Sequence, residues 1–359
     1  MIEQHFGESA PFSVGVEEEV MIVDGESFAP APAVTTLVAE AESAGLPGRL
    51  KTELFAWVVE LNTNVCDSPA EALEAIRDLR RGSDEIAQRH GLRIAAGGSH
   101  PIVRPEEQEI APDQRYLEFV EYAGISALRQ GVNGLHVHVG MPSAEACMRV
   151  LEAILPWHPL VLALSANSPY LAGEETGLAS NRAEILAQLP RHSAPPAFTG
   201  YEDWERFVDR FVRLGLADDY TRFWWDVRPH PKFGTLEIRM PDQPTSVELT
   251  GAFVGLIQGL CALAADGPVV PPDPAGRGIY AQNRWAALRF GPRAELIHPD
   301  GERLVSAAEL LDDLRDRLRD PSVLDAFDPE RCEGDRQLET GRTRGLEAVC
   351  AELVERTVA

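Results

Sequence analysis

Apolar and polar side chains alternate with a period of two residues in several short stretches of the chain. This period predicts β-strands, because successive side chains of a strand point to opposite faces. The most informative stretch is 235–240, where apolar residues at 236, 238 and 240 alternate with Glu237 and Arg239. One face of this strand therefore carries a carboxylate beside a guanidinium. Because acidic residues are uncommon in strands, we regard this face as a candidate site.

The same layout recurs in three other predicted strands, whose polar faces carry acids, histidines or an amide. The residues that share a face are Glu17 with Glu19, Glu60 with Asn62, and His136 with His138. If these faces converge with that of Glu237 and Arg239, the sequence predicts a metal- and phosphate-binding site. Carboxylates are the ligands that Mg²⁺ prefers, and an arginine stabilises charge on a phosphoryl group.

Glu18 departs from this pattern. It falls on the face of Val16, Val20 and Ile22, which is otherwise apolar. An unpaired buried carboxylate costs free energy. We therefore expect either a bulge in the strand or a partner for Glu18.

The remaining patterns predict an α+β fold. Strands are expected over 13–23, 50–54, 57–64, 92–96, 126–140, 223–228 and 234–240. Helices are expected over 34–44, 68–89, 113–123, 143–155, 158–167, 179–188, 202–214 and 245–265, with a mainly helical part from about 295. Several strands follow one another without a helix between them, which favours an antiparallel or mixed sheet with helices on one side. We see no domain boundary and expect a single domain over 1–359.

Composition narrows the class of protein. The formal net charge is −24 and the pI about 4.8, so the surface repels nucleic acids and anionic membranes. No apolar run is expected to reach the ~20 residues that span a bilayer, and the N-terminus lacks signal-peptide features. The five cysteines contain no Cys-x-x-Cys motif, which favours reduced thiols and a cytoplasmic protein.

Each candidate residue also has a plainer interpretation. Glu17 and Glu19 could be acids of an exposed edge strand, Glu237 and Arg239 could form a simple salt bridge, and Arg182 could lie on an exposed helix. His136 and His138 could instead belong to a zinc hydrolase, although no third histidine or cysteine lies close by in sequence. Glu60 lies in a strongly apolar run, where a metal or cation would offset its burial.

Several segments together resemble the glutamate–cysteine ligase superfamily, specifically its YbdK-type carboxylate–amine ligases. The chain has no Gly-rich phosphate loop of the Walker or dinucleotide type. The similar segments follow the family's order over roughly 12–290, and they are 15–19, 53–66, 133–140, 164–169 with 176–182, 225–230 with 235–239, and 283–285. The Asn-Gly-x-His-x-His and Glu-x-Arg motifs also resemble glutamine synthetase, which shares the fold.

The resemblance implies a glutamine-synthetase-like catalytic domain, in which a curved, mainly antiparallel sheet forms an active-site funnel with helices outside. It implies an ATP-dependent ligase that forms an amide through a γ-glutamyl phosphate, with ADP and phosphate released. Its substrates would be L-glutamate, cysteine or another amine, and ATP with Mg²⁺ or Mn²⁺. The resemblance also makes a homo-oligomer plausible. It leaves open that the protein is a non-catalytic relative that only binds a nucleotide.

By the same resemblance, the metal ligands would be Glu17, Glu19, Glu53, Glu60, His136 and Glu237. Arg239 would stabilise the transferring phosphoryl group, and His138 would lie near the phosphates. Arg182, Arg228, Asn133 and Gly134 would lie near substrate or nucleotide. The loops 97–112 and 170–178 are expected to shield the reactive intermediate from water.

Overall fold

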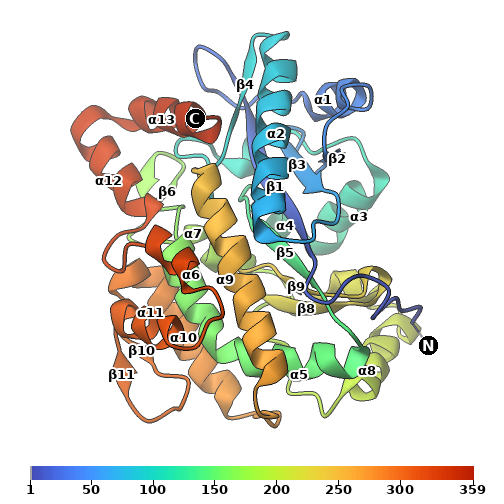
Figure 1. The fold of residues 1–359 in the computed structure, drawn as a ribbon. Helices are drawn as coiled ribbons and strands as arrows, with labels where there is room; N and C mark the ends of the chain where they lie inside the picture. Colours follow the sequence, from blue (N-terminus) through green and yellow to red (C-terminus); the bar gives the residue numbers. More distant parts are fainter. Residues whose placement is uncertain (1) are drawn as a thin grey trace.

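A seven-stranded sheet organises residues 2–359, the part of the chain that our computed structural model describes (Figure 1). Its strands are β1 (Val14–Asp24), β2 (Gly48–Thr52), β3 (Val58–Thr63), β4 (Leu92–Ala95), β5 (Leu135–Gly140), β8 (Val227–His230) and β9 (Thr235–Ile238). The order is β2-β3-β1-β5-β9-β8, with β4 paired to the end of β1. All pairings are antiparallel. The predicted α+β fold with a mainly antiparallel sheet is confirmed.

Helices surround this sheet, and α9 packs against both α2 and α5 along one side of it (Figure 1). The helices are α1 (Val34–Ala41), α2 (Pro69–Gln88), α3 (Gln114–Ala123), α4 (Ile125–Leu128), α5 (Ala144–Ile154), α6 (His158–Ser165), α7 (Asn181–Leu186), α8 (Tyr201–Arg213), α9 (Val247–Asp266), α10 (Gly276–Phe290), α11 (Ala307–Arg315), α12 (Glu333–Arg344) and α13 (Leu346–Thr357). Pro69 is the first residue of α2, and the Ser68 side chain accepts a hydrogen bond from the backbone N–H of Glu71, which caps the helix.

The main core lies where the apolar faces of the central strands meet these helices. Val16, Val137 and Ile238 are fully buried there, together with side chains of α5 and α9. These apolar residues alternate with the candidate site residues along each strand. Burying one face therefore presents the polar side chains of the other face on the opposite side of the sheet.

Two element predictions are wrong in detail, and the prediction of a mainly helical C-terminal part omits a short hairpin. The strand expected over 126–140 begins only at Leu135, because residues 125–128 form α4 and a loop follows it. The strand expected over 223–228 is displaced to β8, so the two tryptophans at 224 and 225 precede it. The C-terminal part is not wholly helical, since β10 (Leu296–Ile297) and β11 (Leu304–Val305) pair as a hairpin.

The expectation that no apolar run would be long enough to span a bilayer is wrong for two helical segments. Ala144–Ser165, which joins α5 and α6, and Val247–Asp266, which is α9, are long and apolar enough by composition to cross a membrane. Both are mostly buried inside the fold. Their apolar character is accounted for by the core that they form with the sheet.

Candidate active site

Strand register brings the predicted polar residues together on one face of the sheet. Across β1 and β5, Glu17 lies opposite His136. Across β1 and β3, Glu19 lies opposite Glu60, and His138 of β5 lies opposite Glu237 of β9. Directly opposed side chains of an antiparallel pair are close neighbours. The convergence that the sequence predicted is therefore present.

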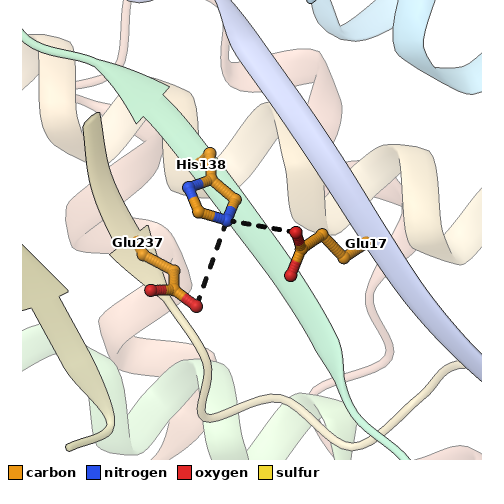
Figure 2. A group of neighbouring side chains, drawn as sticks. All are labelled: Glu17, His138 and Glu237. Carbon is orange, nitrogen blue, oxygen red and sulfur yellow. Dashed lines mark ion pairs between the residues drawn. The ribbon is translucent and has the colours of Figure 1, made fainter. Parts of the chain in front are cut away.

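The first candidate metal group consists of Glu17, His138 and Glu237, whose ligand atoms all lie within 4.8 Å of one another (Figure 2). Nε2 of His138 lies 3.7 Å from a carboxylate oxygen of Glu17 and 4.0 Å from one of Glu237. The other ring nitrogen, Nδ1, is 2.9 Å from the Thr235 hydroxyl. Nε2 is buried and makes no hydrogen bond. A buried ring nitrogen that faces two carboxylates without a hydrogen bond has the surroundings expected of a cation ligand.

The second candidate metal group consists of Glu19, Glu53 and Glu60, again with oxygen atoms within 4.8 Å of one another. Burial, together with the charges of Glu19 and Glu60, raises the pKa of Glu53 to about 8. Burial and the charge of Glu17 raise the pKa of Glu60 to about 7. Carboxylates crowded in this way hold protons when no other cation is present. A divalent cation would take the place of those protons.

The acids of the first group are ionised more easily. Burial alone would raise the pKa of Glu17, but its contacts with His136 and His138 lower that pKa well below the ordinary value. Burial of Glu237 is likewise outweighed by the nearby charges of Arg228 and Arg239, which hold its pKa well below the ordinary value. The two groups thus differ in how readily their carboxyl groups ionise, although each group includes one residue of β1.

His136 lies between the two groups. Its Nδ1 is 3.4 Å from Glu17, and its Nε2 is 3.9 Å from Glu19. The group with Glu17 and Glu237 contains His138, although the resemblance named His136 and not His138 among the metal ligands. We treat both histidines as candidate ligands.

The two arginines next to Glu237 occupy different positions. Arg228 is buried, donates to both carboxylate oxygens of Glu237 at 2.7 and 3.1 Å, and also donates to the carbonyls of Thr221 and Phe223. Arg239 also donates to Glu237, but its side chain is 20% exposed. Arg239 is therefore the arginine that a substrate can reach, and Arg228 orients the carboxylate.

The other expected binding residues support the strands. Arg182 is buried and donates to the carbonyls of Arg239 and Met240 at 3.0 and 2.9 Å. The Gly134 N–H donates to Glu19, and a Cβ at Gly134 would lie 2.0 Å from the Arg182 guanidinium. Asn133 is fully buried and donates to the Gly97 carbonyl. Gly134 therefore permits the close approach that sets Glu19 and Arg182 in place.

Two clefts flank the row of acids and histidines. The aromatic cleft, of about 610 Å³, has Glu19, Glu53, His136 and Arg239 at its base and Phe119 and Trp224 on its wall. The basic cleft, of about 530 Å³, has Glu17 and His138 at its base and Arg49, Lys51 and Lys232 on its wall. Arg182 lines the aromatic cleft, whereas Arg228 and Asn133 line neither. Each cleft thus has access to a different candidate metal group.

Several cleft residues were not predicted from the sequence, and Lys51 and Gln130 are two of them. Lys51 of β2 lies opposite Glu60 and is 3.3 Å from its carboxylate. Gln130 follows α4 and lines the aromatic cleft. The pairing of β2 with β3 could have revealed Lys51, but no local pattern marks Gln130.

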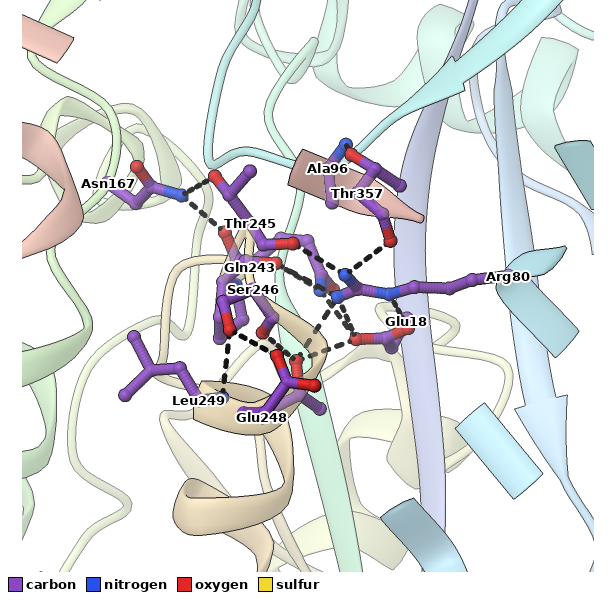
Figure 3. A network of polar contacts seen from close by, with 12 residues as sticks. Glu18, Arg80, Ala96, Asn167, Gln243, Thr245, Ser246, Glu248, Leu249 and Thr357 are labelled. Carbon is purple, nitrogen blue, oxygen red and sulfur yellow. Dashed lines mark hydrogen bonds and ion pairs between the residues drawn. The ribbon is translucent and has the colours of Figure 1, made fainter. Parts of the chain in front are cut away.

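The opposite face of β1 explains Glu18. Arg80 of α2 donates to both carboxylate oxygens of Glu18 at 2.8 and 2.6 Å, and both side chains are only 1% exposed (Figure 3). Gln243 and Thr250 donate to the same carboxylate. Arg80 also donates to the carbonyl of Thr357 near the C-terminus. Of the two sequence-based alternatives for Glu18, the partner is therefore the one observed.

Comparisons with known proteins agree with this geometry. The sequence profile described as glutamate-cysteine ligase family 2 (GCS2) matches residues 13–343. A relative from Rubrobacter xylanophilus is 40% identical over 317 residues, which are 88% of this chain and 86% of the relative. The glutamate–cysteine ligase of Haloferax volcanii is 35% identical over 344 residues, 95% of this chain and 96% of the relative.

A solved structure shares the fold. The glutamate–cysteine ligase of Francisella tularensis in complex with AMP superposes with a TM-score of 0.73 at 14% identity, over 98% of this chain and 89% of that chain. The family profile and the similar relatives both span most of the sequence. The chain therefore belongs to glutamate–cysteine ligase family 2, a family of ATP-dependent ligases that join a carboxylate to an amine.

Proposed function

We propose that this ligase activates the γ-carboxylate of L-glutamate with ATP and joins it to an amine, with cysteine as the default amine. Relatives from Haloferax volcanii and Halobacterium salinarum carry the name glutamate–cysteine ligase, and that name is the ground for these two amino acids. The observation that carries the proposal is that one row of acids and histidines lines two clefts, with Glu19 and His136 in the first and Glu17 and His138 in the second. Phosphoryl transfer needs its two substrates held face to face in this way.

We assign the nucleotide to the basic cleft. Arg49, Lys51 and Lys232 line it, and three cations suit a polyphosphate in a chain whose net charge is −24. Phe233 of the same cleft is 46% exposed and offers an aromatic face. The acid and the amine would then occupy the aromatic cleft, where Arg239 lies at the base.

The two candidate metal groups fit divalent cations, and we propose Mg²⁺ or Mn²⁺. The donors are carboxylate oxygens and one ring nitrogen, and the crowding of Glu19, Glu53 and Glu60 raises two carboxyl pKa values. Glu17, His138 and Glu237 would hold one ion, Glu19, Glu53 and Glu60 another, and His136 could serve either. When bound, such ions neutralise phosphate charge and so let two anionic substrates approach each other.

The chain's own residues would then act on the reacting groups. A γ-carboxylate oxygen attacks the γ-phosphorus of ATP, the bond to the bridging oxygen breaks, and ADP leaves with that electron pair. Arg239 would donate to the transferring phosphoryl oxygens. The amine nitrogen next attacks the acyl carbon, the carbon–oxygen bond to phosphate breaks, and the amine loses a proton as phosphate departs. Lys51 lies 3.3 Å from Glu60 and 3.9 Å from Glu17, and would keep these acids oriented.

Two alternatives from the sequence receive less support. A zinc hydrolase built on His136 and His138 needs both rings in one group, yet each group found among residues 2–359 contains at most one histidine. A non-catalytic nucleotide-binding relative has no need of Arg239 at the base of the cleft. We further propose a cytoplasmic enzyme, in keeping with five buried free cysteines, and a homo-oligomer.

The first experiment is ADP release from ATP and Mg²⁺, with L-glutamate and a panel of amines. ADP that forms with glutamate and increases with an amine supports the proposal. ATP binding without ADP release from any pair would contradict the ligase function proposed here. A parallel titration with Mg²⁺ and with Zn²⁺ distinguishes the hydrolase, which would need zinc and no ATP.

A further inference from the structure

The aromatic cleft has a wall that the transfer of phosphate does not use. Beyond the acids and Arg239 at its base, the lining has an apolar part and a charged part. The apolar part contains Leu54, Phe119, Val132, Leu189, Trp224 and Trp225, and the charged part includes Arg115, Glu118, Asp218 and Arg222. A volume of about 610 Å³ falls in the range of roughly 300–1,000 Å³ that accommodates drug-sized ligands. Most of these apolar side chains are largely buried, and Phe119 is 8% exposed. Glutamate and cysteine are both small and polar, so they would leave the apolar surface that Phe119 and Trp224 present to the cleft without an apolar partner.

We propose that the amine substrate carries an aromatic or similarly bulky apolar group, and that this group packs against Phe119 and Trp224. The inference rests on the function proposed above and names its amine class. Burial of apolar surface stabilises a complex in proportion to the area removed from water. A matching side group on the amine therefore gains affinity that the thiol of cysteine cannot supply.

The wall is already arranged for such a group. The rings of Phe119 and Trp224 lie 5.3 Å apart at an interplanar angle of 37°. The guanidinium of Arg191 lies 5.5 Å from the ring centre of Trp224. Leu54, Phe119 and Leu189 are buried in one core cluster, against which Trp224 packs. A ligand would therefore meet a preformed surface and would not have to order it.

Gln130 adds a polar anchor at this wall. Its amide nitrogen donates to the carbonyls of Ser126 and Ile185 at 2.9 and 3.1 Å, which fixes the orientation of the amide. The amide oxygen has no hydrogen-bond partner, and the residue is only 9% exposed. A buried acceptor without a partner, on a residue that lines the cleft, suits a ligand N–H or O–H that reaches it. An amine brings that donor together with its apolar group.

The test compares amines of different size at saturating L-glutamate, ATP and Mg²⁺ with the full-length chain. The amines are L-cysteine, L-2-aminobutyrate, L-phenylalanine and phenethylamine, and kcat/KM is measured from ADP release. We expect at least one aromatic amine to exceed both cysteine and 2-aminobutyrate by tenfold or more, a ratio typical of apolar pockets that discriminate by size.

Substitutions of the cleft residues test whether the preference for an aromatic amine arises at Phe119 and Trp224. Phe119→Ala and Trp224→Ala should each lower kcat/KM for the aromatic amine about tenfold, and Trp224→Phe should retain most of it. Trp285→Ala is the matched control, because Trp285 is 51% exposed on α10 and lines neither cleft. Thermal unfolding of each variant shows whether the fold is retained.

The outcomes separate the two proposals. If kcat/KM with cysteine or 2-aminobutyrate is at least as high as with both aromatic amines, the proposed ligase function is supported, but the proposal of an aromatic amine is wrong. The proposal of an aromatic amine is also wrong if Trp285→Ala lowers kcat/KM for that amine as much as Trp224→Ala does. If no pair releases ADP, the proposed function fails, and the inference that rests on it fails as well.

Discussion

Arg239 is the residue on which the proposed phosphoryl transfer depends most directly. Its side chain lies at the base of the aromatic cleft and is partly exposed, whereas Arg228 is buried behind the same carboxylate. We predict that Arg239→Ala lowers kcat for ADP release by about a hundredfold to a thousandfold, as expected when a donor to developing negative charge is removed. The fold should be retained, since Glu237 keeps its ion pair with Arg228.

The control for this prediction is Arg206→Ala, because Arg206 is an exposed arginine of α8 that lies outside both clefts. ADP release and thermal unfolding are measured for both variants. Wild-type turnover in a folded Arg239→Ala protein would remove Arg239 from the mechanism.

The crowded carboxylates Glu53 and Glu60 predict a pH dependence of stability in the absence of metal. Their pKa values are raised from 4.5 to about 8 and about 7, so the folded chain binds these protons more tightly than the unfolded chain does. The stability that they contribute is complete below pH 4.5 and is lost as the pH rises through 7 and 8. We predict that the metal-free protein unfolds at a lower temperature at about pH 9 than at about pH 6.

Mg²⁺ should remove most of this pH dependence, because the cation replaces the protons. The double variant Glu53→Gln/Glu60→Gln should also show a flatter profile without metal, and should need more Mg²⁺ for activity. Thermal unfolding with EDTA or with Mg²⁺ at the two pH values measures the effect. A Tm that rises with pH in EDTA would contradict the assigned proton binding.

Apart from Glu53, which lies between β2 and β3, sequence alternation placed each predicted acid and histidine on the correct face of its strand, because the period of a strand is a local property. It did not predict which histidine joins which acids, since Glu17 and His136 are 119 residues apart and meet only through the β1–β5 register. The place of Lys51 and Gln130 in the clefts was not predicted for the same reason. Their importance comes from neighbours that the chain supplies from distant segments.

At the scale of elements, the ion pair of Glu18 with Arg80 joins β1 to α2, and Arg80 also donates to carbonyls before α9 and near the C-terminus. Arg80→Met would leave the Glu18 carboxylate buried without its cation. We predict a loss of about 3–5 kcal/mol in the free energy of unfolding, the usual cost of breaking a buried ion pair by removing one partner. Urea denaturation measures it.

The double variant Glu18→Gln/Arg80→Met serves as the control, because it removes both charges. It should be more stable than Arg80→Met alone, although it still loses hydrogen bonds. A loss below about 1 kcal/mol in Arg80→Met would mean that the pair contributes little to the fold. Glu17 and Glu19 lie on the other face of the same strand. The activity of the folded fraction of Arg80→Met therefore shows whether the Glu18–Arg80 ion pair also positions these two acids.

Long periodic elements were predictable from sequence, and irregular ones were not. The apolar periods of α2 and α9 and the alternation of β1 gave correct elements within a few residues. The start of β5 was wrong because α4 and a loop with Gly131 and Asn133 precede it. The loops 97–112 and 170–178, expected to shield the site, contribute no residue to either cleft within residues 2–359.

At the scale of the whole molecule, charge is the dominant long-range property. The chain carries 57 acidic and 33 basic residues, and most of its ion pairs lie on the surface, where each contributes little. Uncompensated negative charge repels itself in the compact state more than in the expanded chain. If ATP binds in the basic cleft as proposed, Arg49, Lys51 and Lys232 supply the local positive charge that a polyphosphate needs on a chain of net charge −24.

This excess charge predicts that salt stabilises the fold. Salt weakens both the repulsion and the surface ion pairs, but a net charge of −24 makes the repulsion the larger effect. We predict that Tm rises with KCl, mostly between about 0.02 M and about 0.2 M, where the screening length falls from roughly 20 Å to below 10 Å. A slow linear rise that continues to high salt would instead indicate salt excluded from the surface. Sucrose at matched osmolality is the control, and a Tm that falls over the low-salt range would show that surface ion pairs outweigh the repulsion.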